Sequence, residues 1–414
     1  MIYSISIVLD KRRVKSNGKF PVKLRVFNKQ LKKDKRYPLD IDLSKQEFEA
    51  IWVNSENKSL RGARKEMELK LKAIETKANA IAKEMTVFDF AKFEIKLFRK
   101  SSDKNSVKYY FDLIISKHLK NNKVGTAESY KYTLNSLVEF SEQKKKCKAD
   151  KLTFSLITYD WLKEYEKFML SKNKSYTTIA IYTRTLRAVF NIAIEENDIS
   201  VDIYPFGKNK YKIPRTKKVK KALSSDELKT LFNAKVSNDN EQKAKDFFFF
   251  SYTCNGMNLK DIALLKYSDI KDGKFSYYRA KTFDKSAEKT EITIYLTDFT
   301  QGVINKYGTK DKNSFVFGII EANQDSETQY KKIKNFTRYL NDHIKRVAKA
   351  NDLPVDLSTY WARHSFATNS LRKGASMEFI SEALNHSDLS VTKNYFAGFE
   401  DEAKKDFANS LLDF

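Results

Sequence analysis

The sequence has few of the residues that build disulfide frameworks and metal sites. Its 414 residues include only two cysteines, Cys147 and Cys254, which lie far apart and match no metal-ligand spacing. This excludes a disulfide framework and indicates a reducing compartment such as the cytoplasm. Internal repeats and low-complexity linkers are also missing from the chain.

Long apolar runs and negative charge are scarce as well. The sequence contains no run of about 20 apolar residues, the length that a membrane-spanning helix needs. The alternating, charged start MIYSISIVLDKRR does not resemble a signal peptide. The chain has 78 Lys and Arg against 53 Asp and Glu, which gives a net charge of +25. This excess indicates a polyanionic partner, and nucleic acid fits it better than a membrane surface.

The length predicts two or three domains, and a hydrophobic fraction of 41% is ample for their cores. We expect a multidomain, mostly helical α+β protein. Its predicted parts are a small antiparallel sheet with a linking helix (1–85), an all-helical unit (86–207), a basic linker (208–221) and a mixed α/β domain (222–414).

Three segments before residue 45 alternate apolar and polar residues, which predicts an antiparallel sheet. Asn17-Gly18 is typical of the turn between its first two strands. Residues 1–40 hold 12 Lys or Arg against three Asp, and Lys23 and Arg25 project from the face opposite the apolar one. For a sheet in isolation, a solvated face would explain these charges.

Helical periodicity follows the sheet. The segment from Ser44 to about Met85 opens with a capping box, and we interpret it as a helix joining the sheet to the next domain. In residues 86–207, amphipathic helices carry Lys and Arg opposite their apolar faces. The linker KNKYKIPRTKKVKK could lie along DNA phosphates, so that two domains clamp a duplex. Candidate phosphate contacts in the helical unit are Thr126, Lys131, Ser175, Thr177 and Arg184.

The chemistry is concentrated between Thr359 and Phe396, where Arg363, His386 and Tyr395 occur together. Arginine offers a fork of donors that fits two phosphate oxygens, and histidine adds a donor or a proton relay. Tyrosine is a nucleophile that leaves a covalent intermediate. Each residue alone is usually structural, but the joint pattern indicates phosphoryl transfer without a metal.

Local signals divide this stretch into helices. Gly374 should end the helix that carries Arg363. The next helix should bury Phe379, Ile380, Ala383 and Leu384. Ser390 could cap a third, short helix that carries Tyr395 between Asn394 and Phe396.

The motifs RHSFAT at 363–368, LNHS at 384–387 and TKNYF at 392–396 resemble those of the tyrosine recombinase (phage integrase) family. The resemblance implies that Tyr395 is the nucleophile, Arg363 the second conserved arginine, His386 the late histidine and His364 a structural buttress. It also implies an arm-type DNA-binding domain for the basic sheet and a SAM-like core-binding domain for the helical unit. Residues 222–414 would then be the catalytic domain.

Two positions depart from the family pattern. Residues 253–262, TCNGMNLKDI, match the family segment T-G-L/M-R-x-x-E, but Asn258 occupies the place of the first arginine. Loss of one charged donor could raise the barrier by roughly 2–4 kcal/mol. Asp261 matches the acidic position and should buttress Arg363. Tyr360 stands where a histidine is usual, and both departures resemble integrases of Bacteroidetes-type mobile elements.

Residues 275–282 and 292–296 predict a β-hairpin. Lys281 matches the family's hairpin lysine, which implies a general acid for the departing 5′ oxygen. Arg279 should lie on the same strand face as Lys281. It could replace the missing positive charge, although a simple phosphate contact is the commoner role for such an arginine.

The resemblance implies a site-specific DNA recombinase that cuts and rejoins DNA through a 3′-phosphotyrosyl bond, without a cofactor, to integrate or excise a mobile element. Expected partners are double-stranded DNA at core and arm sites and accessory DNA-bending proteins from the host or the element. The protein should form a tetramer on DNA, linked through residues 401–414, in the cytoplasm with the nucleoid. A recombinase-derived DNA-binding regulator and a type IB topoisomerase stay open as alternatives.

Overall fold

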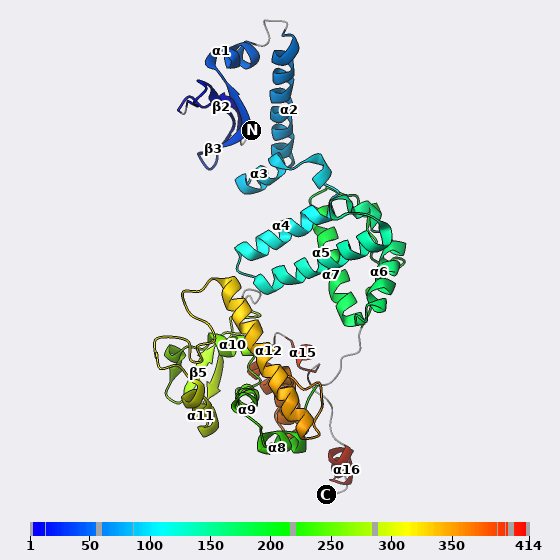
Figure 1. Ribbon diagram of the computed structural model, residues 1–414, viewed down its shortest axis with the longest axis vertical. Helices are drawn as coiled ribbons and strands as arrows, with labels where there is room; N and C mark the ends of the chain where they lie inside the picture. The colour runs from blue at the N-terminus through cyan, green and yellow to red at the C-terminus, as the bar shows by residue number, and fades with distance from the viewer. Residues whose placement is uncertain are drawn as a thin grey trace. The chain divides into compact units, whose positions relative to one another are not determined.

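The computed structural model describes residues 3–12, 14–54, 60–85, 87–215, 221–283, 289–386, 388–393, 395 and 401–410 (Figure 1). The chain divides into two compact units, Met1–Ser106 with Ala193–Ser200, and Val107–Ile192 with Val201–Phe414. Among these described ranges, no helix is both long and apolar enough to cross a membrane.

The predicted N-terminal sheet is confirmed. Strands β1 (Tyr3–Leu9), β2 (Phe20–Asn28) and β3 (Lys33–Leu43) pair antiparallel in the order β1-β2-β3. Leu24 and Val26 in the central strand are fully buried, whereas Lys23 and Arg25 are partly exposed. The period of two in the sequence therefore places one apolar and one basic face, as expected.

The helix predicted from Ser44 to Met85 is not continuous. The predicted capping box of Ser44 and Glu47 opens α1 (Lys45–Phe48), a π-helical turn follows at Glu49–Val53, and α2 spans Gly62–Glu84. Part of the connection, residues 55–59, lies outside the described residues.

Helix α2 covers the sheet and does not serve as a linker, which corrects our interpretation. Helix α2 lies beside the strands (Figure 1). Its residues Leu71 and Ala78 are fully buried in the core that it shares with the strands. Helix α3 (Phe90–Phe98) adds Phe93 and Leu97 to the same core. A three-stranded sheet needs an apolar cover to be stable, and α2 and α3 provide it. The first unit consequently extends to Ser106, beyond the predicted boundary at residue 85.

The predicted helical unit is present in the second compact unit. Its four long helices are α4 (Val107–Lys120), α5 (Val124–Lys145), α6 (Tyr159–Ser171) and α7 (Tyr176–Glu195). Tyr211 is buried, and its hydroxyl donates to Glu166 at 2.6 Å. The predicted linker 208–221 therefore begins with residues that pack on the helices, and its residues 216–220 lie outside the described residues.

The C-terminal part is built around α9, whose run of four phenylalanines is buried on all sides. Phe247, Phe248 and Phe250 share a core with Leu340 and Ile344 of α12. The elements of this part are α8 (Ser225–Asn233), α9 (Asp239–Thr253), α10 (Leu259–Leu264), β4 (Ile270–Lys271), β5 (Lys274–Tyr277), β6 (Ile292–Tyr295), α11 (Asp298–Tyr307), α12 (Ser326–Ala350), α13 (Tyr360–Arg372), α14 (Met377–Ala383), α15 (Leu389–Lys393) and α16 (Asp401–Ser410).

The last helices follow the predicted order with two corrections. Gly374 ends α13 with a φ of +90°, as predicted. Phe379, however, is 55% exposed, because the short α14 packs only the face that carries Ile380 and its neighbours. Helix α15 begins before Ser390, and Tyr395 lies beyond its end. Predictions that involve Ser387, Asn394, Phe396 and residues 411–414, and the side chains of Ala403 and Phe407, fall outside the described residues.

We expect Leu71→Ala to destabilise the N-terminal unit by about 2–5 kcal/mol, because it leaves a cavity under the sheet. Hydrogen exchange of the β1–β3 amides in the full chain measures this change. Leu69→Ala is the control, because Leu69 lies on the same helix but is 54% exposed and should change stability by under about 0.5 kcal/mol. Equal exchange in both variants would contradict the packing of α2 on the sheet.

Candidate active site

Arg363 is the centre of the site and one of the largest fully buried side chains, with 1% of its surface exposed. Its Nη1 donates to the carbonyl oxygen of Gly256 at 3.0 Å, and its Nη2 donates to that of Leu384 at 2.6 Å. Nη2 also lies 3.3 Å from Nε2 of His386. The guanidinium group thus connects the turns after α9 and α14, while its Nε has no partner in the described structure.

Gly256 is required by this arrangement. Its φ is +66°, and a Cβ there would lie 2.7 Å from Cα of Arg363. Backbone and arginine therefore approach more closely than any side chain would permit. The sequence match to the family segment included this glycine but did not reveal that it contacts Arg363.

Arg279 lies next to Arg363 and is 6% exposed. Its Nη1 donates weakly, at 3.5 Å, to the Leu384 carbonyl oxygen that also accepts from Arg363. Burial and the charge of Arg279 both lower the pKa of Arg363. Two guanidinium groups therefore share one acceptor, which is unfavourable without a negative charge nearby.

Asp261 provides a buried carboxylate, but it does not hold Arg363 as predicted. Its Oδ1 accepts from the backbone N–H of Ala280 at 2.9 Å. Burial raises the pKa of Asp261, and the charges on Arg279 and Arg363 partly offset this effect. Asp261 therefore positions the segment that carries Arg279, and its effect on Arg363 is electrostatic.

The predicted strand for Arg279 and Lys281 is wrong. Strand β5 ends at Tyr277, and the N–H groups of Thr282 and Phe283 donate to the carbonyl oxygen of Arg279 to form a turn. Lys281 is exposed in this turn, whereas Arg279 is buried. The two side chains do not share a strand face.

His386 is held in a defined protonation state. Because arginine can only donate, Nε2 of His386 accepts from Arg363, and Nδ1 carries the proton that it donates to Thr392 Oγ1 at 2.9 Å. Burial and the neighbouring guanidinium groups lower the pKa of His386 to about 3. The imidazole is therefore neutral near pH 7, and its Nε2 lone pair is occupied by the hydrogen bond from Arg363.

Tyr395 lies against this cluster. Its ring is stacked on His386, with centroids 5.0 Å apart, and the Arg363 Cζ lies 5.7 Å from its centroid. Thr368 Oγ1 donates to the Tyr395 carbonyl oxygen at 3.0 Å, which fixes the backbone. Burial raises the pKa of Tyr395. The hydrogen bond with Tyr360 and the guanidinium charges together lower this pKa by more than burial raises it, so the net shift is downward.

Tyr360 contacts the expected nucleophile directly. The hydroxyl oxygens of Tyr360 and Tyr395 are 2.9 Å apart. Burial and the same hydrogen bond raise the pKa of Tyr360 to about 12. Tyr360 therefore stays protonated and can donate to an ionised Tyr395.

His364 lies beside both tyrosines. Its ring centroid is 4.6 Å from that of Tyr395 and 5.0 Å from that of Tyr360. Burial lowers the pKa of His364 to about 4, so the ring is neutral near pH 7. This position under the nucleophile agrees with the predicted structural role.

Asn258 is at the start of α10, beside a cavity of about 150 Å³ that Tyr360 and Arg363 also line. Asn258, the neutral residue at the place of the family's first arginine, therefore faces the site. The sequence did not point to Thr368 and Thr392, which hold Tyr395 and His386. Buried threonines carry no distinguishing sequence signal.

The predicted DNA contacts of the helical unit lie on its surface. Thr126, Lys131, Ser175, Thr177 and Arg184 are all exposed on α5 and around the start of α7. In the sheet, Lys23 forms an ion pair with Asp10 at 2.8 Å, and Arg25 forms one with Asp34 at 2.6 Å. Within the described parts of the chain, no group of three or more His, Cys, Asp or Glu could hold a metal ion.

Three family models match the chain. They are the Arm DNA-binding domain at residues 7–99, the Phage integrase SAM-like domain at 106–213 and the Phage integrase family at 221–402. The chain therefore belongs to the phage integrase family of tyrosine recombinases.

Relatives and solved structures agree with this assignment. A tyrosine recombinase of Thermosipho africanus is 25% identical over 56% of this chain and 78% of its own length. The XerC recombinase of Pediococcus pentosaceus is 26% identical over 59% of this chain and 79% of its own.

The fold is similar to that of the Tn1549 transposon integrase in complex with transposon right end DNA, with a TM-score of 0.51, 17% identity and coverage of 74% of this chain and 99% of that one. A lambda integrase dimer bound to a core site also has a TM-score of 0.51, with 17% identity, over 71% and 97% of the two chains. The predicted mostly helical α+β fold is confirmed.

We expect Gly256→Ala to lower the free energy of unfolding more than Gly273→Ala does. Both glycines have positive φ, but a Cβ at Gly273 meets no atom within 4 Å. For the control Gly273→Ala, the free energy of unfolding should fall by about 1–2 kcal/mol, because alanine disfavours the left-handed backbone conformation. For Gly256→Ala it should fall by about 1–3 kcal/mol more, because the new Cβ clashes with Arg363. Urea unfolding followed by circular dichroism measures both. Equal losses would mean that the Arg363 backbone shifts without cost.

Proposed function

We propose that this recombinase cuts one strand of duplex DNA through Tyr395. The Tyr395 hydroxyl loses its proton to solvent and its oxygen attacks the scissile phosphorus, the bond to the 5′ oxygen breaks, and a 3′-phosphotyrosyl bond replaces it. Lys281 gives a proton to the departing 5′ oxygen. Rejoining reverses these steps with a 5′-hydroxyl, so the phosphodiester bond energy is retained and ATP is not needed.

The observation that carries this proposal is the surplus of buried positive charge beside the Tyr395 hydroxyl. Arg279 and Arg363 are both more than nine-tenths buried, and Asp261 is the buried carboxylate that faces them. Nε atoms of both arginines lack partners in the described structure. A phosphate that gains negative charge in the transition state would supply the missing anion.

Arg279 replaces the charge that Asn258 does not provide. An arginine that only contacts DNA phosphates would lie on the surface. Arg279 instead is buried beside Arg363 and lowers the pKa of Arg363. Asn258 then acts as a neutral donor beside the cavity. Arg363 and Arg279 together present the two charged forks that phosphate stabilisation needs.

Tyr360 positions and acidifies the nucleophile. A histidine, which is usual at this place in the family, could relay a proton, whereas Tyr360 stays protonated and can only donate to the Tyr395 oxygen. The neutral His386 lies against the Tyr395 ring and accepts a hydrogen bond from Arg363, so it helps to hold both side chains in place.

The wider assignment includes double-stranded DNA at core and arm sites, a tetramer on DNA and accessory DNA-bending proteins. We also propose integration or excision of a mobile element, in the cytoplasm with the nucleoid. The net charge of +25 and the exposed polar residues of α5 and α7 support DNA as the partner.

The first test uses a nicked suicide duplex whose cleavage cannot reverse, built on the ends of the element that encodes the protein. Wild type should form a covalent protein–DNA band on a denaturing gel, and Tyr395→Phe should form none. Tyr295→Phe, in an exposed tyrosine of β6, should behave as wild type. DNA binding without a covalent band in wild type would favour a regulator. Cleavage without exchange between two duplexes would favour a topoisomerase.

The role of Arg279 predicts a rescue. Arg279→Ala should lower the single-turnover cleavage rate by 10²- to 10³-fold, about 2.7–4 kcal/mol, as loss of a transition-state donor does. Adding Asn258→Arg should recover at least tenfold, because the adjoining cavity of about 150 Å³ has room for the longer side chain. Asn258→Gln in the same background is the uncharged control. An equal rate in both double variants would contradict a charge replacement.

A further inference from the structure

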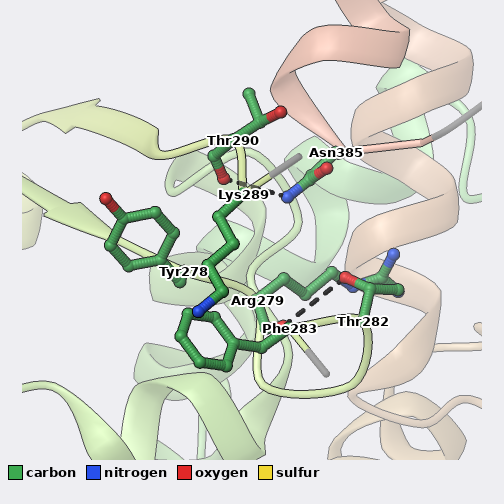
Figure 2. Close-up of a pocket in the computed structure, with 7 residues that line it drawn as sticks. All are labelled: Tyr278, Arg279, Thr282, Phe283, Lys289, Thr290 and Asn385. Atoms are coloured by element: carbon green, nitrogen blue, oxygen red, sulfur yellow. Dashed lines mark hydrogen bonds between the residues drawn. The ribbon is translucent and has the colours of Figure 1, made fainter. Parts of the chain in front are cut away.

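A second hollow lies beside Arg279, and its lining residues are drawn in Figure 2. It is small and open to solvent, with a volume of about 10 Å³ against about 150 Å³ for the cavity beside Asn258. Asn385, just after α14, donates to the Thr290 carbonyl oxygen at 3.2 Å and closes one side. Its lining residues are Tyr278, Arg279, Thr282, Phe283, Lys289, Thr290 and Asn385.

Aromatic rings and a cation form the floor of this hollow. The rings of Tyr278 and Phe283 lie 5.6 Å apart at 64° and are 46% and 38% exposed. The ammonium of Lys289 lies 4.1 Å from the Phe283 ring centroid. Exposed rings on a hairpin are often incidental, but a ring pair beside a cation is typical of surfaces that bind single-stranded nucleic acid.

The position of the hollow indicates which nucleotide it could meet. Arg279 forms its wall and also donates to the Leu384 carbonyl oxygen that Arg363 uses. Lys281, the proposed donor to the 5′ oxygen, is in the turn between Tyr278 and Phe283. The hollow therefore borders the strand that leaves when the phosphotyrosyl bond forms.

We propose that Tyr278 and Phe283 form a stacking platform for the base of the nucleotide that carries the released 5′-hydroxyl. Lys289 neutralises the next phosphate of that strand. The hollow is too open to enclose a base, so the platform contacts a ring face and accepts any of the four bases. This inference rests on the proposed function and adds to it a site that retains the freed end for rejoining or exchange.

The test measures rejoining, in which an added 5′-hydroxyl oligonucleotide attacks the phosphotyrosyl phosphorus and Tyr395 leaves with the proton. Covalent complex is first made on the suicide duplex and quantified, so that rates are expressed per complex. The concentration of acceptor at half-maximal rate is then measured for an intact acceptor and for one that lacks its first base. Tyr278→Leu and Phe283→Leu are compared with Tyr295→Leu, an exposed ring outside the hollow.

Wild type and Tyr295→Leu should need about tenfold more abasic than intact acceptor, which corresponds to about 1.4 kcal/mol. Tyr278→Leu and Phe283→Leu should need about tenfold more intact acceptor than wild type to reach the half-maximal rejoining rate. With the abasic acceptor, the concentration that these two variants need should rise little further. An unchanged ratio between the two acceptors in both variants would overturn the platform.

Two other outcomes separate this inference from the proposed function. If wild type forms no covalent complex, the proposed function fails and the platform fails with it. If wild type forms the complex but both platform variants do not, the aromatic pair serves cleavage, and its assignment to the leaving strand is wrong.

Discussion

The structure of the site depends on holding two buried guanidinium groups together, with no carboxylate among the described residues in contact with either. Arg363 and Arg279 both donate to the Leu384 carbonyl oxygen, and the partial charge of one carbonyl does not neutralise them. Such an arrangement persists only if the surrounding packing fixes it. The buried core of α9 and α12 and the capped ends of the neighbouring helices supply that rigidity.

The close approach of Gly256 shows how local backbone serves this charge pair. Its left-handed conformation turns a carbonyl oxygen toward Arg363, and the missing Cβ makes the approach sterically acceptable. Asp261 acts one step further away, because it fixes the N–H of Ala280 next to Arg279. Backbone groups therefore position the arginines, and their outer donors stay available for phosphate.

The sequence predicted the strands of the N-terminal sheet, the order of the helices and the cluster of Arg363, His386 and Tyr395. These are local patterns, and a period of two or an invariant motif is readable without the fold. The packing of α2 on the sheet was not predicted, because an amphipathic stripe does not say which surface covers it. Arg279 was predicted to lie on a strand, because the sequence does not show where the hairpin strand ends. In the structure the strand ends at Tyr277, and a turn that reaches Phe283 follows it.

The hydrogen bond from Thr368 to the Tyr395 carbonyl oxygen has a consequence for assembly. The tyrosine, its hydroxyl partner Tyr360 and both arginines belong to one chain and meet within it. On the proposed function, the nucleophile and the two arginines that act on the phosphate therefore come from the same subunit, and cleavage takes place in cis. A neighbouring subunit then need not contribute any of these residues.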